Sequence, residues 1–158
     1  MRQTELAPDP DDRDRWVLPG VGTFLRTGRT SRAATAEAAG RTWKIQRRGL
    51  VRTGFIATDE SGEPAGELKN PTMGSGETLR WNGRELALRY DDAHRAHALS
   101  DGDRALARFA PKVAGKRPLD VVIEDPDVDP GLLLFAAFIV QAYADDASFP
   151  QGPSAPSG

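Results

Sequence analysis

The chain contains no cysteine, and its 158 residues include only two histidines and two methionines. The absence of cysteine excludes disulfides, thiolate metal ligands and a cysteine nucleophile, and it is compatible with a reducing cytoplasm, the expected location. An excess of charge of one sign is also lacking, because 21 Lys and Arg stand against 23 Asp and Glu, for a net charge of −2. Nucleic acid is therefore not an expected partner.

The N-terminal residues lack the basic start and the apolar stretch of a secretory signal. Residues 1–15 are charged and contain Pro8 and Pro10, and residues 148–158 are rich in Pro, Ser and Gly. Such segments bury little apolar surface, so both are predicted to be disordered. One folded domain is expected over residues 16–147, a length that can bury a real core.

The middle of the chain has the two-residue periodicity of half-buried strands. In residues 85–90, for example, Leu86, Leu88 and Tyr90 alternate with polar or small side chains. The same alternation occurs at residues 43–46 and 119–124, and Gly-containing turns are expected at residues 59–62, 82–83 and 101–102. Connections this short favour antiparallel hairpins. Residues 27–40 are rich in small residues and fit either a loop or a short helix.

A weak internal repeat emerges when Trp43 is aligned with Trp81. Each Trp is expected to open a strand that leads into a hairpin, turning at residues 59–62 in one case and at residues 101–102 in the other. This layout indicates either two similar sheet units or the ordinary likeness of hairpins of common composition.

The most informative segment is a helix predicted over about residues 130–144, with Asp129 as its N-cap and Pro130 as its first residue. It is apolar on every side, with Gln141 as the polar exception. Thirteen residues, 132–144, rise only about 20 Å, less than the roughly 30 Å of a bilayer core. The helix is therefore expected to be enclosed by protein and not to span a membrane. The side chains expected to form this core are Leu132, Leu134, Phe135, Phe138, Ile139 and Tyr143.

The order of elements resembles that of a known family. The resemblance rests on residues 56–62 and 99–107, two strand-and-turn stretches, and on residues 129–134, which lead into the apolar helix. In this layout the chain looks like the LURP-one-related and tubby C-terminal-like superfamily, which includes the phospholipid scramblases. The resemblance implies a mostly β (α+β) fold, in which an antiparallel β-barrel of about a dozen strands encloses the C-terminal helix. Better known members bind phosphoinositides or other membrane lipids, although their binding residues have no residue-by-residue match here.

Two clusters of residues are candidates for metal binding or acid–base chemistry. The acidic run 124–129 imitates the start of a calcium loop, but Pro130 and Ala136 occupy the places of the required Gly and Glu. A solvated, helix-capping turn is the favoured interpretation. Asp91, Asp92, His94 and His97 form the second cluster. It would suit an enzyme of unrecognised type, but residues three apart on a strand face opposite ways, so a polar hairpin turn is favoured. No metal or cofactor is expected.

A basic cluster remains, formed by Lys44, Arg47, Arg48 and Arg52, with a smaller group at Lys112, Lys116 and Arg117. The first cluster could bind anionic head groups, or it could form the solvent face of strands, where cations protect sheet edges. The leading hypothesis is a non-enzymatic binding module for a lipid, an acyl group or a protein, cytoplasmic or peripheral at the membrane. The alternatives are the enzyme above and a structural subunit whose Pro-rich tail engages another chain.

Overall fold

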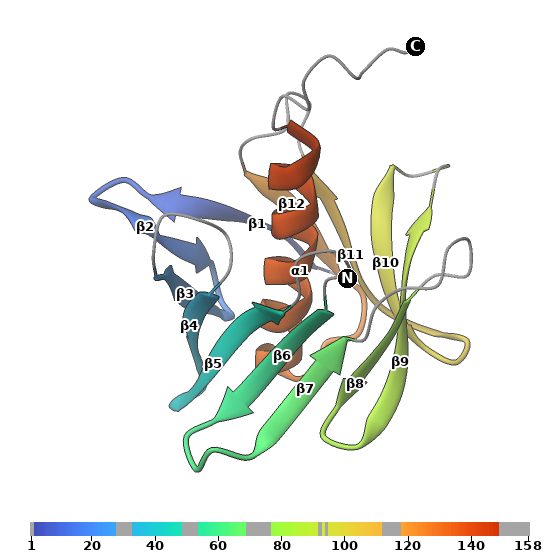
Figure 1. The fold of residues 1–158 in the computed structure, drawn as a ribbon. Coiled ribbons are helices and arrows are strands. Elements are labelled where there is room, and N and C mark those ends of the chain that lie inside the picture. Colours follow the sequence, from blue (N-terminus) through green and yellow to red (C-terminus); the bar gives the residue numbers. More distant parts are fainter. Residues whose placement is uncertain are drawn as a thin grey trace.

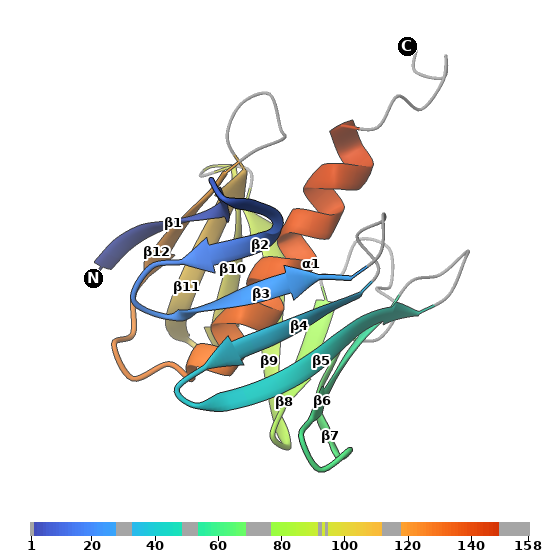
Figure 2. The ribbon, with the colours of Figure 1, turned by 90° about the vertical axis from the view of Figure 1, so that its left-hand side faces the viewer.

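The chain folds into a closed β-barrel that surrounds one helix (Figures 1 and 2). The computed structural model describes residues 2–27, 33–48, 54–68, 77–91, 93, 95–111 and 118–148. Within these residues, twelve antiparallel strands and a single helix, α1 (Pro130–Ser148), account for the regular structure. The predicted mostly β fold, an antiparallel barrel enclosing a hydrophobic C-terminal helix, is confirmed.

The barrel is an up-and-down barrel, because each strand pairs with its neighbours in the sequence and β1 pairs with β12 to close the ring. Closure leaves no free sheet edge among the strands that the structure describes. The strands are β1 (Arg2–Asp9), β2 (Asp12–Leu18), β3 (Gly22–Arg26), β4 (Ala33–Ala38), β5 (Arg41–Arg48), β6 (Gly54–Asp59), β7 (Pro64–Leu68), β8 (Glu77–Trp81), β9 (Arg84–Asp91), β10 (Ala96–Asp101), β11 (Arg104–Pro111) and β12 (Leu119–Ile123).

The N-terminal segment is part of the barrel, so the prediction that residues 1–15 are disordered is wrong for residues 2–15. Strand β1 pairs with β12, with Leu6 opposite Leu119, and the Leu6 side chain is completely buried. Pro8 is tolerated because pairing with β12 ends at Leu6, so the missing N–H of Pro8 removes no bond on that side. The folded domain therefore includes residues 2–15 and does not start at residue 16.

Two other boundaries also differ from prediction. Strand β4 replaces the loop or short helix expected within residues 27–40, while residues 28–32 lie outside the described residues. Its alanines pack against large side chains of β5, since Ala36 lies opposite Trp43 and Ala34 lies opposite Ile45, and small side chains facing large ones fill the barrel evenly.

Helix α1 runs beyond residue 144 to Ser148, and residues 149–158 of the predicted tail lie outside the described residues.

Helix α1 fills the barrel as predicted. Its residues from Gly131 to Ala142 are all buried, including Gln141, whereas Tyr143 is partly buried against the core. Five of the six expected core side chains (Leu132, Leu134, Phe135, Phe138 and Ile139) are at most 4% exposed. Phe138 makes edge-to-face contacts with Phe24 and Phe55 at 5.5 and 6.1 Å between ring centroids. Among the described residues, no helix combines the length and the apolar content needed to cross a bilayer.

The start of α1 rests on two tryptophans. Trp43 lies near the start of β5 as expected, but Trp81 ends β8 instead of opening a strand, so the repeat is not preserved in the fold. The two rings lie 5.8 Å apart between centroids. Gly131 fits beneath them, because a Cβ at this position would lie 2.6 Å from the Trp43 ring and 2.9 Å from the Trp81 ring. Close packing at this point therefore requires glycine in the first turn of α1.

Candidate functional site

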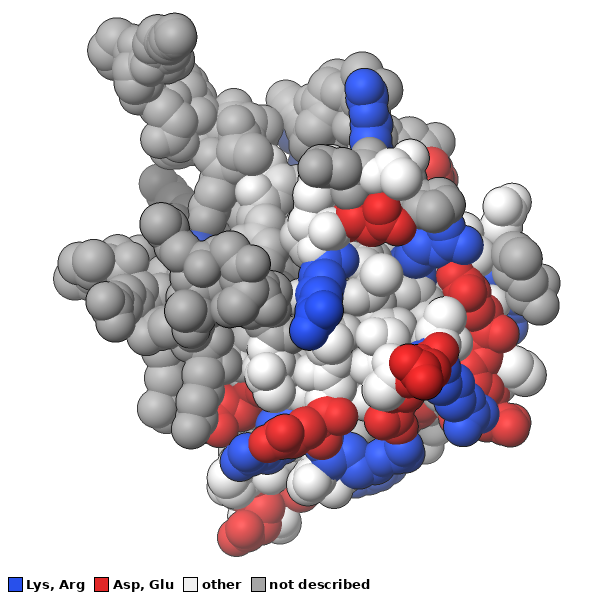
Figure 3. Space-filling model, turned by 90° about the vertical axis from the view of Figure 1, so that its right-hand side faces the viewer, with Lys and Arg blue, Asp and Glu red and all other residues white. Residues whose placement is uncertain are grey.

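The barrel has two chemically different ends, which we name by the course of α1. The entry end is where α1 begins, beside the short turns that join β2 to β3, β4 to β5, β6 to β7, β8 to β9 and β10 to β11. The exit end is where α1 leaves the barrel (Figure 2). On the face of the wall seen in Figure 3, Lys and Arg side chains lie among Asp and Glu side chains around an uncharged centre, and Arg80 is paired with Glu85 at 3.0 Å. A site selective for one charge is therefore better sought at the ends.

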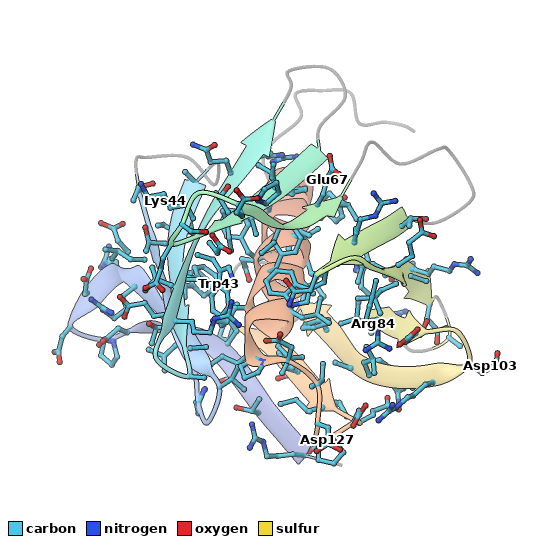
Figure 4. The ribbon with its side chains drawn as sticks, turned by 90° about the horizontal axis from the view of Figure 1, so that it is seen from below. Trp43, Lys44, Glu67, Arg84, Asp103 and Asp127 are labelled. Atoms are coloured by element: carbon cyan, nitrogen blue, oxygen red, sulfur yellow. The ribbon has the colours of Figure 1, made fainter. Side chains whose placement is uncertain are left out.

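The predicted basic cluster is divided between the two faces of β5. Trp43 and Ile45 point into the core, so Lys44 between them is exposed on the outer wall (Figure 4). Arg47 continues the inward-facing set, and its guanidinium carbon lies 5.4 Å from the centre of the buried Phe55 ring. The backbone of Arg48 pairs with β6, but its side chain and all of Arg52 lie outside what the structure describes, as do Lys112, Lys116 and Arg117. Lys44 and Arg47 thus do not share a face.

A second inward-facing arginine, Arg26, was not singled out from the sequence. It ends β3, two residues after the buried Phe24, and its guanidinium carbon lies 5.8 Å from the centre of the Trp16 ring. Both Arg26 and Arg47 therefore occupy the exit-end rim with their cations over aromatic faces, a contact that orients a guanidinium. The two-residue alternation of strands could have identified Arg26 from the sequence, because the spacing from Phe24 to Arg26 repeats the spacing from Ile45 to Arg47.

Aromatic rings continue across the exit end between these strands and β9. Phe55 contacts Tyr143 of α1 at 5.9 Å, Tyr143 contacts His97 at 5.8 Å, and His97 contacts Tyr90 at 5.2 Å between ring centroids. Tyr90 belongs to the inward-facing series of β9 but lies at the rim and is 54% exposed, so it does not share the burial of Leu86 and Leu88. We call Arg26, Arg47, Tyr90, His97 and Tyr143 the exit mouth.

The proposed acid–base cluster is not assembled by the residues that the structure describes. Asp91 turns outward, where its carboxylate accepts a hydrogen bond from the backbone N–H of Ala93 at 3.0 Å. His97 instead lies between two tyrosine rings, and burial lowers the pKa of its imidazole. Among described residues, none hydrogen-bonds to the buried Nδ1 of His97. Asp92 and His94 lie outside the described residues.

The acidic run at the entry end is engaged in structural contacts. Glu124 accepts a hydrogen bond from Arg108 at 2.8 Å, and Asp125 forms an ion pair with Arg104. Asp129 caps α1 as predicted, since its Oδ1 accepts from the backbone N–H of Gly131 at 2.8 Å. Within the described parts of the chain, no group of three or more His, Cys, Asp or Glu side chains is arranged to hold a metal ion.

Two pockets flank the connection between β12 and α1. The smaller, about 150 Å³, lies beside the β8–β9 turn and is lined by both members of two ion pairs, Arg84 with Asp101 and Arg104 with Asp125. The larger, about 230 Å³, lies beside the β2–β3 turn. Figure 4 shows this end from below, with Trp43 beside α1 and Asp103 at the periphery. Because α1 fills the barrel, these concavities lie at its end and not along its axis.

Comparison with known proteins gave no relatives: no protein-family model matches the chain, and no curated protein and no solved structure matches it. The geometry of the two ends is therefore the basis for inferring function.

Proposed function

We propose that the protein is a non-enzymatic binding module that docks on anionic lipid head groups through its exit mouth. The observation that carries this proposal is the pair of inward-facing arginines, Arg26 and Arg47, each held over an aromatic ring at the same end of the barrel. A planar guanidinium can form two parallel hydrogen bonds to a phosphate. Because the ring beneath it already orients the guanidinium, the arginine side chain loses less conformational entropy on binding.

The aromatic side chains of the exit mouth favour a membrane surface as the source of these head groups. Tyr90 is 54% exposed, and the partly buried Tyr143 lies on the other side of the His97 ring. Tyrosine is amphipathic and concentrates at membrane–water interfaces, where its ring meets the acyl boundary and its hydroxyl stays wet. Each basic side chain near an acidic surface contributes roughly 1 kcal/mol, which is screened as salt rises. Location is therefore proposed as cytoplasmic and peripheral at the membrane.

The fold agrees with this proposal. A closed barrel threaded by its last helix is the arrangement implied by the resemblance to the tubby C-terminal-like and scramblase superfamily, and we propose membership on that layout. Among the described residues, the buried side chains of α1 occupy the barrel axis, which favours binding of a lipid at the surface. Asp91 and His97 face opposite ways, so the geometry does not favour the enzyme hypothesis.

Flotation with lipid vesicles tests the proposal. At low salt the protein should float with vesicles of phosphatidylcholine and phosphatidylserine but not with phosphatidylcholine alone, and high salt should release it. Replacing both Arg26 and Arg47 with Gln should reduce the bound fraction several-fold. Arg41→Gln is the matched control, because Arg41 lies on the same strand as Arg47 and over a ring, 5.2 Å from Trp43, but at the entry end. Equal binding to both vesicle types, or equal losses for the two sets of variants, would contradict the proposal.

A further inference from the structure

The larger pocket at the entry end has an apolar lining and a single charge. Its volume is about 230 Å³, and it opens between the start of β1, the β2–β3 turn and the connection to α1. The side chains that line it include Arg2, Val21, Ile123, Pro126, Val128 and Leu133. None of the lining residues is acidic, so Arg2 alone sets the charge preference of the pocket.

Arg2 lies against the β2–β3 turn at the pocket wall. Gly20 adopts a φ of +80° there, and a Cβ built on it would lie 3.1 to 3.3 Å from the guanidinium atoms of Arg2. The guanidinium group therefore lies against the bare backbone of this turn. A glycine at this position permits both the left-handed turn and the close approach of the cation.

The acidic residues nearby do not neutralise Arg2. Glu124 is bound to Arg108, Asp125 to Arg104, and Asp129 to the start of α1. Asp127, the remaining carboxylate of this connection, is not part of the pocket lining. No described residue forms an ion pair with Arg2. The pocket thus combines an apolar concavity with a cation that has no partner among the described residues.

We propose that this pocket binds a short-chain aliphatic monocarboxylate, whose carboxylate pairs with Arg2 and whose chain lies against Val21, Val128 and Leu133. The guanidinium fork matches a carboxylate in two parallel hydrogen bonds. An apolar cavity of about 150 Å³ accommodates benzene, so by proportion this pocket accommodates about nine non-hydrogen atoms, an acid of roughly six or seven carbons. The site lies at the opposite end of α1 from the exit mouth, so it does not depend on the lipid-binding proposal.

Titration with hexanoate tests the inference, using protein with any affinity tag placed at the C-terminus so that β1 stays free. Hexanoate should bind saturably, with a dissociation constant in the millimolar range expected for so small a ligand, and should shift the amide resonances of Gly20 and Val21 in nitrogen–proton spectra. Hexan-1-ol, which has the chain without the charge, and hexylammonium, which has the opposite charge, should bind at least tenfold more weakly.

Variants connect this binding to the named side chains. Arg2→Gln should weaken hexanoate binding tenfold or more, whereas Arg13→Gln, the same substitution on the exposed part of β2 near the other end of the barrel, should leave it unchanged. Val21→Phe should fill the pocket and block binding, with thermal unfolding confirming that the variant is folded. The inference is overturned if hexanoate fails to saturate, if hexan-1-ol binds as tightly, or if Arg2→Gln and Arg13→Gln behave alike.

Discussion

Removal of the Asp129 carboxylate should destabilise the protein more than the loss of an ordinary helix cap. Its two oxygens accept from two different donors: Oδ1 from the Gly131 backbone N–H at 2.8 Å, and Oδ2 from the indole Nε1–H of Trp81 at 3.0 Å. Trp81 is only 4% exposed, so its indole ring belongs to the interior. Asp129→Ala therefore removes the cap of α1 and leaves a buried donor unsatisfied.

The magnitude follows from these two contacts. Loss of an N-cap costs about 0.5–2 kcal/mol. A hydrogen bond to a charged group contributes about 1.5–3 kcal/mol, and a donor left unsatisfied in the interior costs a similar amount. We therefore expect Asp129→Ala to lower the free energy of unfolding by about 2–5 kcal/mol, a large share of the 5–15 kcal/mol typical of a domain. Asp129→Ser keeps a capping oxygen but lacks the second acceptor, so only the contribution of the Trp81 contact should be lost.

Urea unfolding followed by circular dichroism measures these differences, and Asp127→Ala is the control because Asp127 is an exposed neighbour in the same connection. A double-mutant cycle between Asp129→Ser and Trp81→Phe isolates the contact of carboxylate with indole. The reasoning is refuted if Asp129→Ala changes the free energy of unfolding by no more than Asp127→Ala, or if the two residues of the cycle act additively.

Three other predictions concern the core, the pH response and closure of the barrel. Phe138→Ala should cost about 3–5 kcal/mol in urea unfolding because the ring packs against Phe24 and Phe55, whereas Phe138→Leu should cost far less. Burial lowers the pKa of His97, so the unfolded chain binds the proton more readily. The free energy of unfolding should therefore fall as the pH drops below about 6.5. In the His97→Phe variant, the free energy of unfolding should fall less between neutral pH and a pH of about 5.5. Deletion of β1 should expose the edges of β2 and β12, and size-exclusion chromatography should then show aggregation in place of a monodisperse peak.

The sequence predicts the central helix well and the first strand poorly, because the helix depends on neighbouring residues and the strand depends on a partner far away in the sequence. The apolar character of α1 is contained in consecutive residues, and its length alone distinguishes an enclosed helix from a membrane span. Strand β1 has only Leu6 as a fully buried residue, and its structure depends on pairing with β12 at the other end of the chain. Local composition, with its charges and prolines, indicates disorder there, and this long-range pairing overrides it.

The candidate site was only partly predictable, because cations that are close in the sequence need not share a face of a strand. Alternation along β5 already places Lys44 and Arg47 on opposite faces, and the same two-residue rule reveals Arg26 after Phe24. The ring contacts of His97 with Tyr90 and Tyr143 were not predictable, since they depend on how α1 lies relative to β9 and β10. The pocket beside Arg2 could not be predicted from the sequence either, because its walls come from three separate segments.

The position of α1 after all twelve strands has a consequence for biogenesis. A ribosome releases the barrel wall before the hydrophobic element that fills it, so the nascent strands have nothing to pack around until residues 130–148 emerge. Closure must also bring Leu6 to Leu119, and such non-local pairings slow folding to milliseconds or longer. During translation the chain therefore passes through a stage of exposed apolar strands in which protection by chaperones counts most.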